Sequence, residues 1–296
     1  MSKVYYNSFF AMGTRLNVVF PYTDEELCER LFNMIENEVH RVELKLSYFI
    51  PESFVSRINN EAFKSSVMVD LEMLEIIKLC LNYNRLTLGA FDITMRRLVD
   101  FFKQNPEATE TDLTSCMQYI QLDDEEKSIR FTDEQTKIDL GGFGKGYALE
   151  KVQRLVNDSP IESAFISFGE SSILAKGKHP SGKTWQVGLN DYINSGQSVY
   201  SFELENGSVS TSSNYFLDDS GQLQFKANVI NPITRNINKE IETVSVQSKS
   251  PLEAEILSTA MLSLNDEKTA ALKEKLNEVE IVKIRYNSGE ASITKF

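Results

Sequence analysis

Two segments near the start of the chain, residues 4–10 and 14–20, alternate between apolar and polar positions. Alternation with a period of two is typical of strands that bury one face, so these segments are expected to pair as a hairpin around residues 11–13. From Thr23 onward the period becomes helical, with Thr23 as the N-cap and Glu26 completing a capping box. The apolar positions of this helix form one stripe that is expected to face the core: Leu27, Leu31, Met34, Ile35, Val39 and Val42.

Later segments of the chain predict more helices first and mainly short strands afterwards. Further helices are expected after Asp70, at 94–103, at 252–264 and at 267–276. Another is expected to follow the glycines near residue 146 and to end at about Val156. Further strands are expected at 119–122, 128–131, 164–168, 173–175, 185–189, 199–203, 243–247, 281–286 and 291–294. Because helices and strands do not alternate regularly, this order favours an α+β fold over a doubly wound sheet. We interpret residues 1–296 as one domain of two lobes, joined by a polar, proline-containing link near 104–112.

A glycine-rich segment at residues 137–149, KIDLGGFGKGYAL, is the most informative motif of the sequence. Glycine lets the backbone turn tightly and approach a ligand closely, because it has no Cβ atom. The free N–H groups at the start of the helix that follows favour an anion such as a phosphate, and Lys145 adds a cation. The spacing is neither that of a P-loop nor that of the dinucleotide fingerprint. A structural turn with a surface lysine has the same spacing, so the pattern alone leaves both interpretations open.

The composition is that of an ordinary soluble globular protein, with 41% hydrophobic and 25% charged residues. A net charge of −12 argues against a nucleic-acid partner, because a nucleic-acid-binding face is basic. Acidic side chains do suit a hard cation such as Mg²⁺. The three cysteines lie far apart, which argues against a disulfide framework, and no run of 18 apolar residues could span a membrane. We therefore expect a cytoplasmic protein without membrane insertion.

Glu255 and Thr259 lie four residues apart in an expected helix, so their side chains share one face. A carboxylate and a hydroxyl placed in this way can both bind one hard cation. By itself such a pair is more often part of a solvated helix face. Asp92, Asp139 and Asn228 are by default turn residues or helix caps.

Taken in their order along the chain, several segments resemble the ApbE family, the FAD:protein FMN transferases. The segment at 139–146 matches the family pattern Asp-Leu-Gly-Gly-x-x-Lys-Gly. The other matching segments lie at 11–14, 46–59, 89–92, 210–212, 231–234 and 254–259. The resemblance runs over almost the full chain. It implies an α+β, ApbE-like fold, related to the T-fold, with mixed or antiparallel sheets flanked by helices.

The resemblance also implies a function: binding of FAD and Mg²⁺, and transfer of FMN to a Thr or Ser hydroxyl of an acceptor protein through a phosphoester bond. By motif position, the residues expected to bind the flavin nucleotide are Met12, Tyr48, Ala90, Phe91, Asp92, Asp139, Lys145, Val229 and Ile230. Those expected to bind the metal are Gly142, through its carbonyl group, Glu255 and Thr259. The position of the catalytic histidine of the family is occupied by Asn228.

This last position is where the sequence departs most from the family pattern. A neutral amide cannot accept a proton at pH 7, so Asn228 cannot replace a histidine as general base. The two histidines, His40 and His179, fall in no matching motif and are expected at the surface. Glu255 also stands where the family has an aspartate. Three hypotheses follow: an active transferase with another base, a weakened or inactive flavin-binding relative, and an FAD pyrophosphatase.

Overall fold

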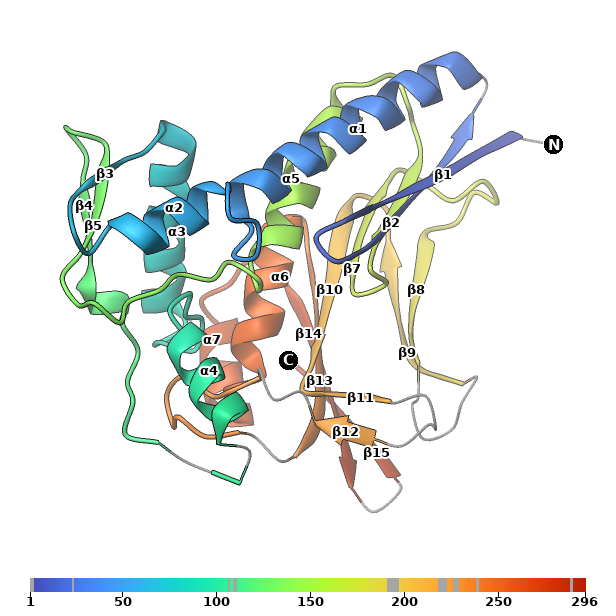
Figure 1. Ribbon diagram of the computed structural model, residues 1–296. Helices are drawn as coiled ribbons and strands as arrows, with labels where there is room; N and C mark the ends of the chain where they lie inside the picture. The colour runs from blue at the N-terminus through green and yellow to red at the C-terminus, as the bar shows by residue number, and fades with distance from the viewer. Residues whose placement is uncertain are drawn as a thin grey trace.

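The structure is a computed structural model that describes residues 3–22, 24–105, 107–108, 111–190, 197–217, 223–225, 229–237, 240–287 and 290–296. Its main element is an eight-stranded sheet in the order β1-β2-β6-β7-β10-β13-β14-β15 (Figure 1). Every neighbouring pair in this sheet is antiparallel. The strands are β1 (Lys3–Ala11), β2 (Thr14–Tyr22), β6 (Ala164–Phe168), β7 (Ser172–Lys176), β10 (Gly207–Ser213), β13 (Ile241–Ser248), β14 (Glu280–Asn287) and β15 (Glu290–Lys295). The sheet thus joins the first strands of the chain to the last.

Three smaller antiparallel sheets and seven α-helices complete the described part of the chain. The smaller sheets contain β3 (Val67–Met68), β5 (Ser128–Phe131) and β4 (Ile120–Asp123); β8 (Trp185–Asn190) and β9 (Ser198–Leu204); and β11 (Tyr215–Leu217) and β12 (Leu223–Phe225). The helices are α1 (Glu25–Leu46), α2 (Phe54–Glu61), α3 (Leu71–Leu86), α4 (Arg96–Gln104), α5 (Gly144–Asn157), α6 (Pro251–Met261) and α7 (Asp266–Lys273), with a 3₁₀ turn, η1 (Met117–Tyr119). The predicted α+β fold with antiparallel sheets flanked by helices is confirmed.

Apolar side chains lie on both faces of the large sheet. Helices α1, α5 and α6 cover one face, and the β8–β9 hairpin lies against the other (Figure 1). Successive side chains of a strand point to opposite faces, so β7 contributes to both cores. Leu174 packs on the helical side, whereas Ile173 and Ala175 pack with Trp185 on the hairpin side. This two-sided burial fixes the register of the central strands, because a shift by one residue would exchange the two faces.

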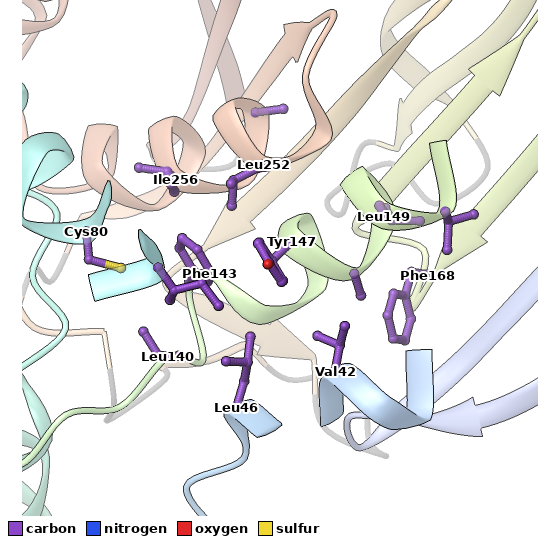
Figure 2. Close-up of a cluster of buried hydrophobic side chains, with 14 of the residues drawn as sticks. Val42, Leu46, Cys80, Leu140, Phe143, Tyr147, Leu149, Phe168, Leu252 and Ile256 are labelled. Carbon is purple, nitrogen blue, oxygen red and sulfur yellow. The ribbon is translucent and has the colours of Figure 1, made fainter. Parts of the chain in front are cut away.

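The glycine-rich segment of the sequence is anchored in the helical core (Figure 2). Phe143 is fully buried and stacks on Tyr147, with ring centroids 5.4 Å apart. Leu140 and Phe143 belong to the same buried cluster as Leu252 and Ile256 of α6. The apolar residues of the motif therefore hold the turn in place, while Gly141, Gly142 and Lys145 stay at least partly exposed.

Local predictions are correct in most of the strongly patterned segments. Asp70 caps α3 as predicted, since its carboxylate accepts a hydrogen bond from the Met73 N–H. The N-cap of α1 is Asp24, which accepts from the Leu27 N–H at 3.1 Å, and the predicted cap Thr23 lies outside the described residues. Met34 is 52% exposed and does not belong to the buried stripe of α1. The proposed link at 104–112 stays a prediction.

Candidate functional site

Two adjoining clefts open beside the glycine-rich turn, with volumes of about 490 and 370 Å³. Four residues line both clefts: Phe49, Asp139, Gly141 and Lys145. Every predicted site residue that the structure describes lines one or both clefts. Those that line the larger cleft are Ala90, Phe91, Asp92, Asp139, Gly142, Lys145, Val229, Ile230, Glu255 and Thr259. Those that line the smaller cleft are Met12, Tyr48, Asp139 and Lys145. Asn228 lies outside the described residues, next to Val229.

The turn before α5 places the start of that helix beside the clefts. Asp139 shapes the turn, because its Oδ1 accepts a hydrogen bond from the Gly141 N–H at 2.9 Å. No side chain caps the N-terminus of α5, where Phe143 occupies the N-cap position. The Gly144 N–H donates to the Leu140 carbonyl at 2.8 Å. Phe143 and Gly144 line the clefts, so α5 begins beside them with its positive dipole end, which favours an anion.

The ammonium group of Lys145 lies between one carboxylate and two hydroxyl groups. Its Nζ is 3.0 Å from Glu255 Oε1 and donates to Ser171 Oγ at 3.0 Å and to Ser172 Oγ at 3.2 Å. The Glu255 side chain is only 4% exposed, and that of Lys145 is 22% exposed. The ion pair is thus buried on its carboxylate side and reaches the cleft on its ammonium side.

The second oxygen of Glu255 is held by two serines of the large sheet. Oε2 accepts hydrogen bonds from Ser172 Oγ at 2.6 Å and from Ser210 Oγ at 2.8 Å. These serines lie directly opposite each other across the β7–β10 pair, so their hydroxyls share one face of the sheet. Burial by itself would raise the pKa of Glu255, but the nearby Lys145 ammonium and the serine hydroxyls outweigh it and lower that pKa. Glu255 is therefore ionised at neutral pH.

Glycines allow α5 and the turn before it to touch α6. A Cβ atom on Gly142 would lie 3.1 Å from Thr259 Cγ2, and one on Gly146 would lie 2.5 Å from Glu255 Cβ. Contacts under 3.0 Å are not tolerated, so Gly146 is required for the close approach of the two helices. The Gly142–Thr259 contact and the Lys145–Glu255 ion pair place the turn against the predicted 255–259 face of α6.

Asp92 lines the larger cleft and has one buried oxygen without a hydrogen-bond partner among the described residues. Its Oδ1 accepts hydrogen bonds from the Thr94 N–H and hydroxyl group, each at 2.6 Å. Its Oδ2 is buried and has no hydrogen-bond partner among the described residues. Burial raises the pKa of Asp92, against the lowering effects of the nearby Ser115 hydroxyl and of the Thr94 hydrogen bonds. A buried carboxylate oxygen without a partner is costly, so a ligand or a proton at this position would stabilise it.

Arg96 and Phe49 line the site but were not predicted from the sequence. The Arg96 guanidinium lies 4.6 Å from the centroid of the Tyr48 ring. It forms ion pairs with Asp100 at 2.7 Å and with Asp139 Oδ2 at 3.8 Å. Phe49 is 76% exposed at the rim of both clefts. A large exposed aromatic beside a glycine turn is the one signal that could have identified Phe49. Nothing in the local pattern distinguishes Arg96 from the other basic residues of its helix.

Histidines and acidic clusters are absent from the clefts. Neither His40 nor His179 lines them, and both side chains are exposed as predicted. Among the described residues, no three His, Cys, Asp or Glu side chains gather in a way that could hold a metal ion. Over the same residues, no helix is long and apolar enough to cross a membrane.

The fold is shared with solved flavin transferases. The structure of the flavin transferase ApbE from Vibrio cholerae is similar with a TM-score of 0.82 and 21% identity, covering 100% of this chain and 97% of that one. The ApbE protein from Thermotoga maritima is similar with a TM-score of 0.81 and 22% identity, covering 98% and 96%. At this level of identity the likeness defines the fold, which is that of the ApbE flavin transferases.

Sequence relatives define the family. The FAD:protein FMN transferase of Haemophilus influenzae is 24% identical over 311 residues, which cover 97% of this chain and 88% of the relative. That of Vibrio cholerae is 25% identical over 292 residues, covering 92% and 85%. The pattern of the ApbE family matches residues 12–282. The chain therefore belongs to the ApbE family, and the resemblance of its motifs is confirmed.

Proposed function

We propose that this chain binds FAD across the two clefts and transfers its FMN part to a Ser or Thr hydroxyl of an acceptor protein, with AMP as the leaving group. The observation that carries this proposal is the position of Lys145 in the first turn of α5, where it lines both clefts together with the predicted residues. Relatives named FAD:protein FMN transferase support the same function. The volumes of the two clefts are in the range of cofactor-binding sites.

Each part of the proposed site has a physical role. Lys145 and the N-terminus of α5 attract the negatively charged diphosphate. Met12 and Tyr48 border the smaller cleft, and Ala90, Phe91, Val229 and Ile230 border the larger one, which gives apolar surfaces for the two ring systems of FAD. Asp139 shapes the turn that carries Lys145.

The proposed reaction is a displacement at phosphorus. The acceptor hydroxyl oxygen forms a bond to the FMN-side phosphorus, and the bond from that phosphorus to the bridging oxygen breaks. AMP leaves with the bonding electron pair, and the hydroxyl proton passes to a base. Asp139 has an arginine beside it and Glu255 a lysine, whereas Asp92 has a buried Oδ2 without a hydrogen-bond partner among the described residues and a raised pKa. Of these three carboxylates of the larger cleft, Asp92 is therefore the best suited to accept the proton.

The expected magnesium ion fits this arrangement poorly. The predicted donors Gly142 and Thr259 touch each other and offer hard oxygen atoms, as Mg²⁺ prefers. Glu255, which should supply the negative charge, already pairs with Lys145 and accepts two serine hydrogen bonds.

A weakened or inactive flavin-binding relative is the second candidate, because Asn228 stands at the position of the histidine of the family. Incubation with FAD and Ser/Thr-containing acceptor peptides, followed by mass spectrometry and AMP detection, separates the alternatives. A peptide that gains FMN while AMP is released supports the transferase. FAD binding without AMP release supports the second candidate, and AMP with free FMN but no labelled peptide identifies a pyrophosphatase. A protein that does not bind FAD overturns the proposal.

Two variants sharpen this experiment. Asn228→His should raise the rate of AMP release, because it restores a base with a pKa near neutrality. Asp92→Asn should lower the rate of transfer by about 10²-fold or more while FAD still binds, if Asp92 accepts the proton. Full transfer activity in Asp92→Asn would remove Asp92 from this role.

A further inference from the structure

The carboxylate of Glu255 has little capacity left for a metal ion. A carboxylate offers about four lone-pair positions, two on each oxygen. Three of them are already used, by Lys145 on Oε1 and by Ser172 and Ser210 on Oε2. The one remaining position on Oε1 lies beside the ammonium group of Lys145. A divalent cation bound there would be placed next to another positive charge.

We infer that the Lys145 ammonium takes the place of a divalent cation in this chain, so that the diphosphate of FAD is bound without a metal ion. The inference rests on the proposed function, because it concerns how the same site binds FAD.

The length of the Glu255 side chain explains why this arrangement can form. The corresponding position of the family pattern is an aspartate, which is one methylene shorter. From α6 the longer side chain reaches across to Ser172 on β7 and Ser210 on β10, where both hydroxyls donate to Oε2. Thr259 follows one helical turn later and packs against the turn at Gly142. The extra methylene therefore commits the carboxylate to the lysine and the sheet.

Charge balance favours the same conclusion. Glu255 and Lys145 cancel each other formally, so the pair offers no net negative charge to attract Mg²⁺ before FAD arrives. The ammonium side of the pair faces both clefts. An incoming phosphate oxygen can accept the hydrogen bond that Lys145 now donates to Ser171. The Ser171 hydroxyl, which lines the larger cleft, can then donate to the phosphate as well. Lys145 would then bridge the buried carboxylate and the ligand.

The test is FAD affinity, measured by calorimetry in EDTA and in millimolar Mg²⁺ on the full chain. The wild-type dissociation constant should agree within about twofold between the two conditions. Lys145→Met should weaken FAD binding in EDTA by about 10- to 100-fold, as expected for loss of a charged hydrogen bond. The matched control is Lys151→Met, on the same helix and also 22% exposed but paired with Glu72 outside the clefts, which should bind FAD as the wild type does.

Glu255→Asp provides an independent test that does not depend on removing a charge. The shorter carboxylate cannot reach the same partners, so Mg²⁺ should improve FAD binding to this variant by about tenfold or more. Equal affinity of Glu255→Asp in EDTA and Mg²⁺ would contradict the role given to side-chain length. Wild-type binding that requires Mg²⁺ would overturn the inference while the proposed function stands. Absence of FAD binding in both conditions would overturn the proposed function and this inference with it.

Discussion

Gly146→Ala is the substitution that most directly tests the packing beneath the site. Gly146 lies in the first turn of α5, where α6 approaches most closely. An added Cβ would be 2.5 Å from Glu255 Cβ and 3.0 Å from the Pro251 carbonyl oxygen. Both atoms belong to the same helix, and a backbone oxygen cannot move aside alone. Helix α6 would have to shift relative to α5, and the Lys145–Glu255 pair would be stretched.

The expected cost follows from two opposing effects. Overpacking of a filled core costs about 1–3 kcal/mol, and the backbone contact places this site at the upper end of that range. Replacing glycine by alanine inside a helix stabilises that helix by up to about 1 kcal/mol. The net loss in the free energy of unfolding should be about 2 kcal/mol. Gly144→Ala is the matched control, because its Cβ would meet nothing closer than Met12 Sδ at 3.9 Å.

Urea unfolding and FAD titration measure the two consequences. Gly146→Ala should unfold at a lower urea concentration than the wild type with an unchanged m-value, and it should bind FAD more weakly. Gly144→Ala should stay within about 0.5 kcal/mol of the wild type. If Gly146→Ala were as stable as Gly144→Ala and bound FAD normally, the close packing of α5 on α6 would not support the site as described.

Three further substitutions probe other parts of the structure. Hydrogen bonds from Arg41 lower the pKa of Glu72 far below its ordinary value although burial opposes them, so Glu72 stabilises the fold above about pH 4.3 and loses this effect as the pH falls further. The stability difference between wild type and Glu72→Gln should therefore shrink in acid. A difference that stays constant with pH would refute this role of Glu72. Arg96→Lys should weaken FAD binding several-fold in the same titration, because a lysine cannot stack flat on Tyr48; unchanged affinity would remove Arg96 from the site. Gly177→Ala should destabilise by more than about 1 kcal/mol in urea, since φ is +61° and its Cβ would lie 2.1 Å from a backbone oxygen; wild-type stability would contradict this geometry.

Periodic segments were predictable because their pattern is local. The β1–β2 hairpin and the long helix α1 follow from alternation and from helical spacing, since a strand or helix with one buried face must repeat its apolar residues at that period. The caps at Asp24 and Asp70 are short side chains that bond to N–H groups three residues ahead. For α1 the sequence predicts Thr23 as the cap, one residue before the observed cap Asp24.

Strand β10 shows why other elements were missed. Its sequence, GSVSTSS, has one large apolar residue and no alternation that a period-two search could detect. It becomes a central strand because β7 and β13 pair with it on both sides and bury its serines. Helix α2 is only eight residues long, too short for its periodicity to be distinctive.

By itself, the sequence determined the fold class, the family and part of the lining of the clefts, though not Phe49 or Arg96, because ordered motifs and glycine spacing are properties of the chain. Only the tertiary structure decided what Glu255 does. Its partners come from α5, β7 and β10, at least 45 residues earlier in the chain. The antiparallel register alone brings Ser172 and Ser210 together beneath it. Whether a carboxylate meets a metal ion or an ammonium group depends on which side chains share its buried space, and such long-range neighbours leave no trace in a local pattern.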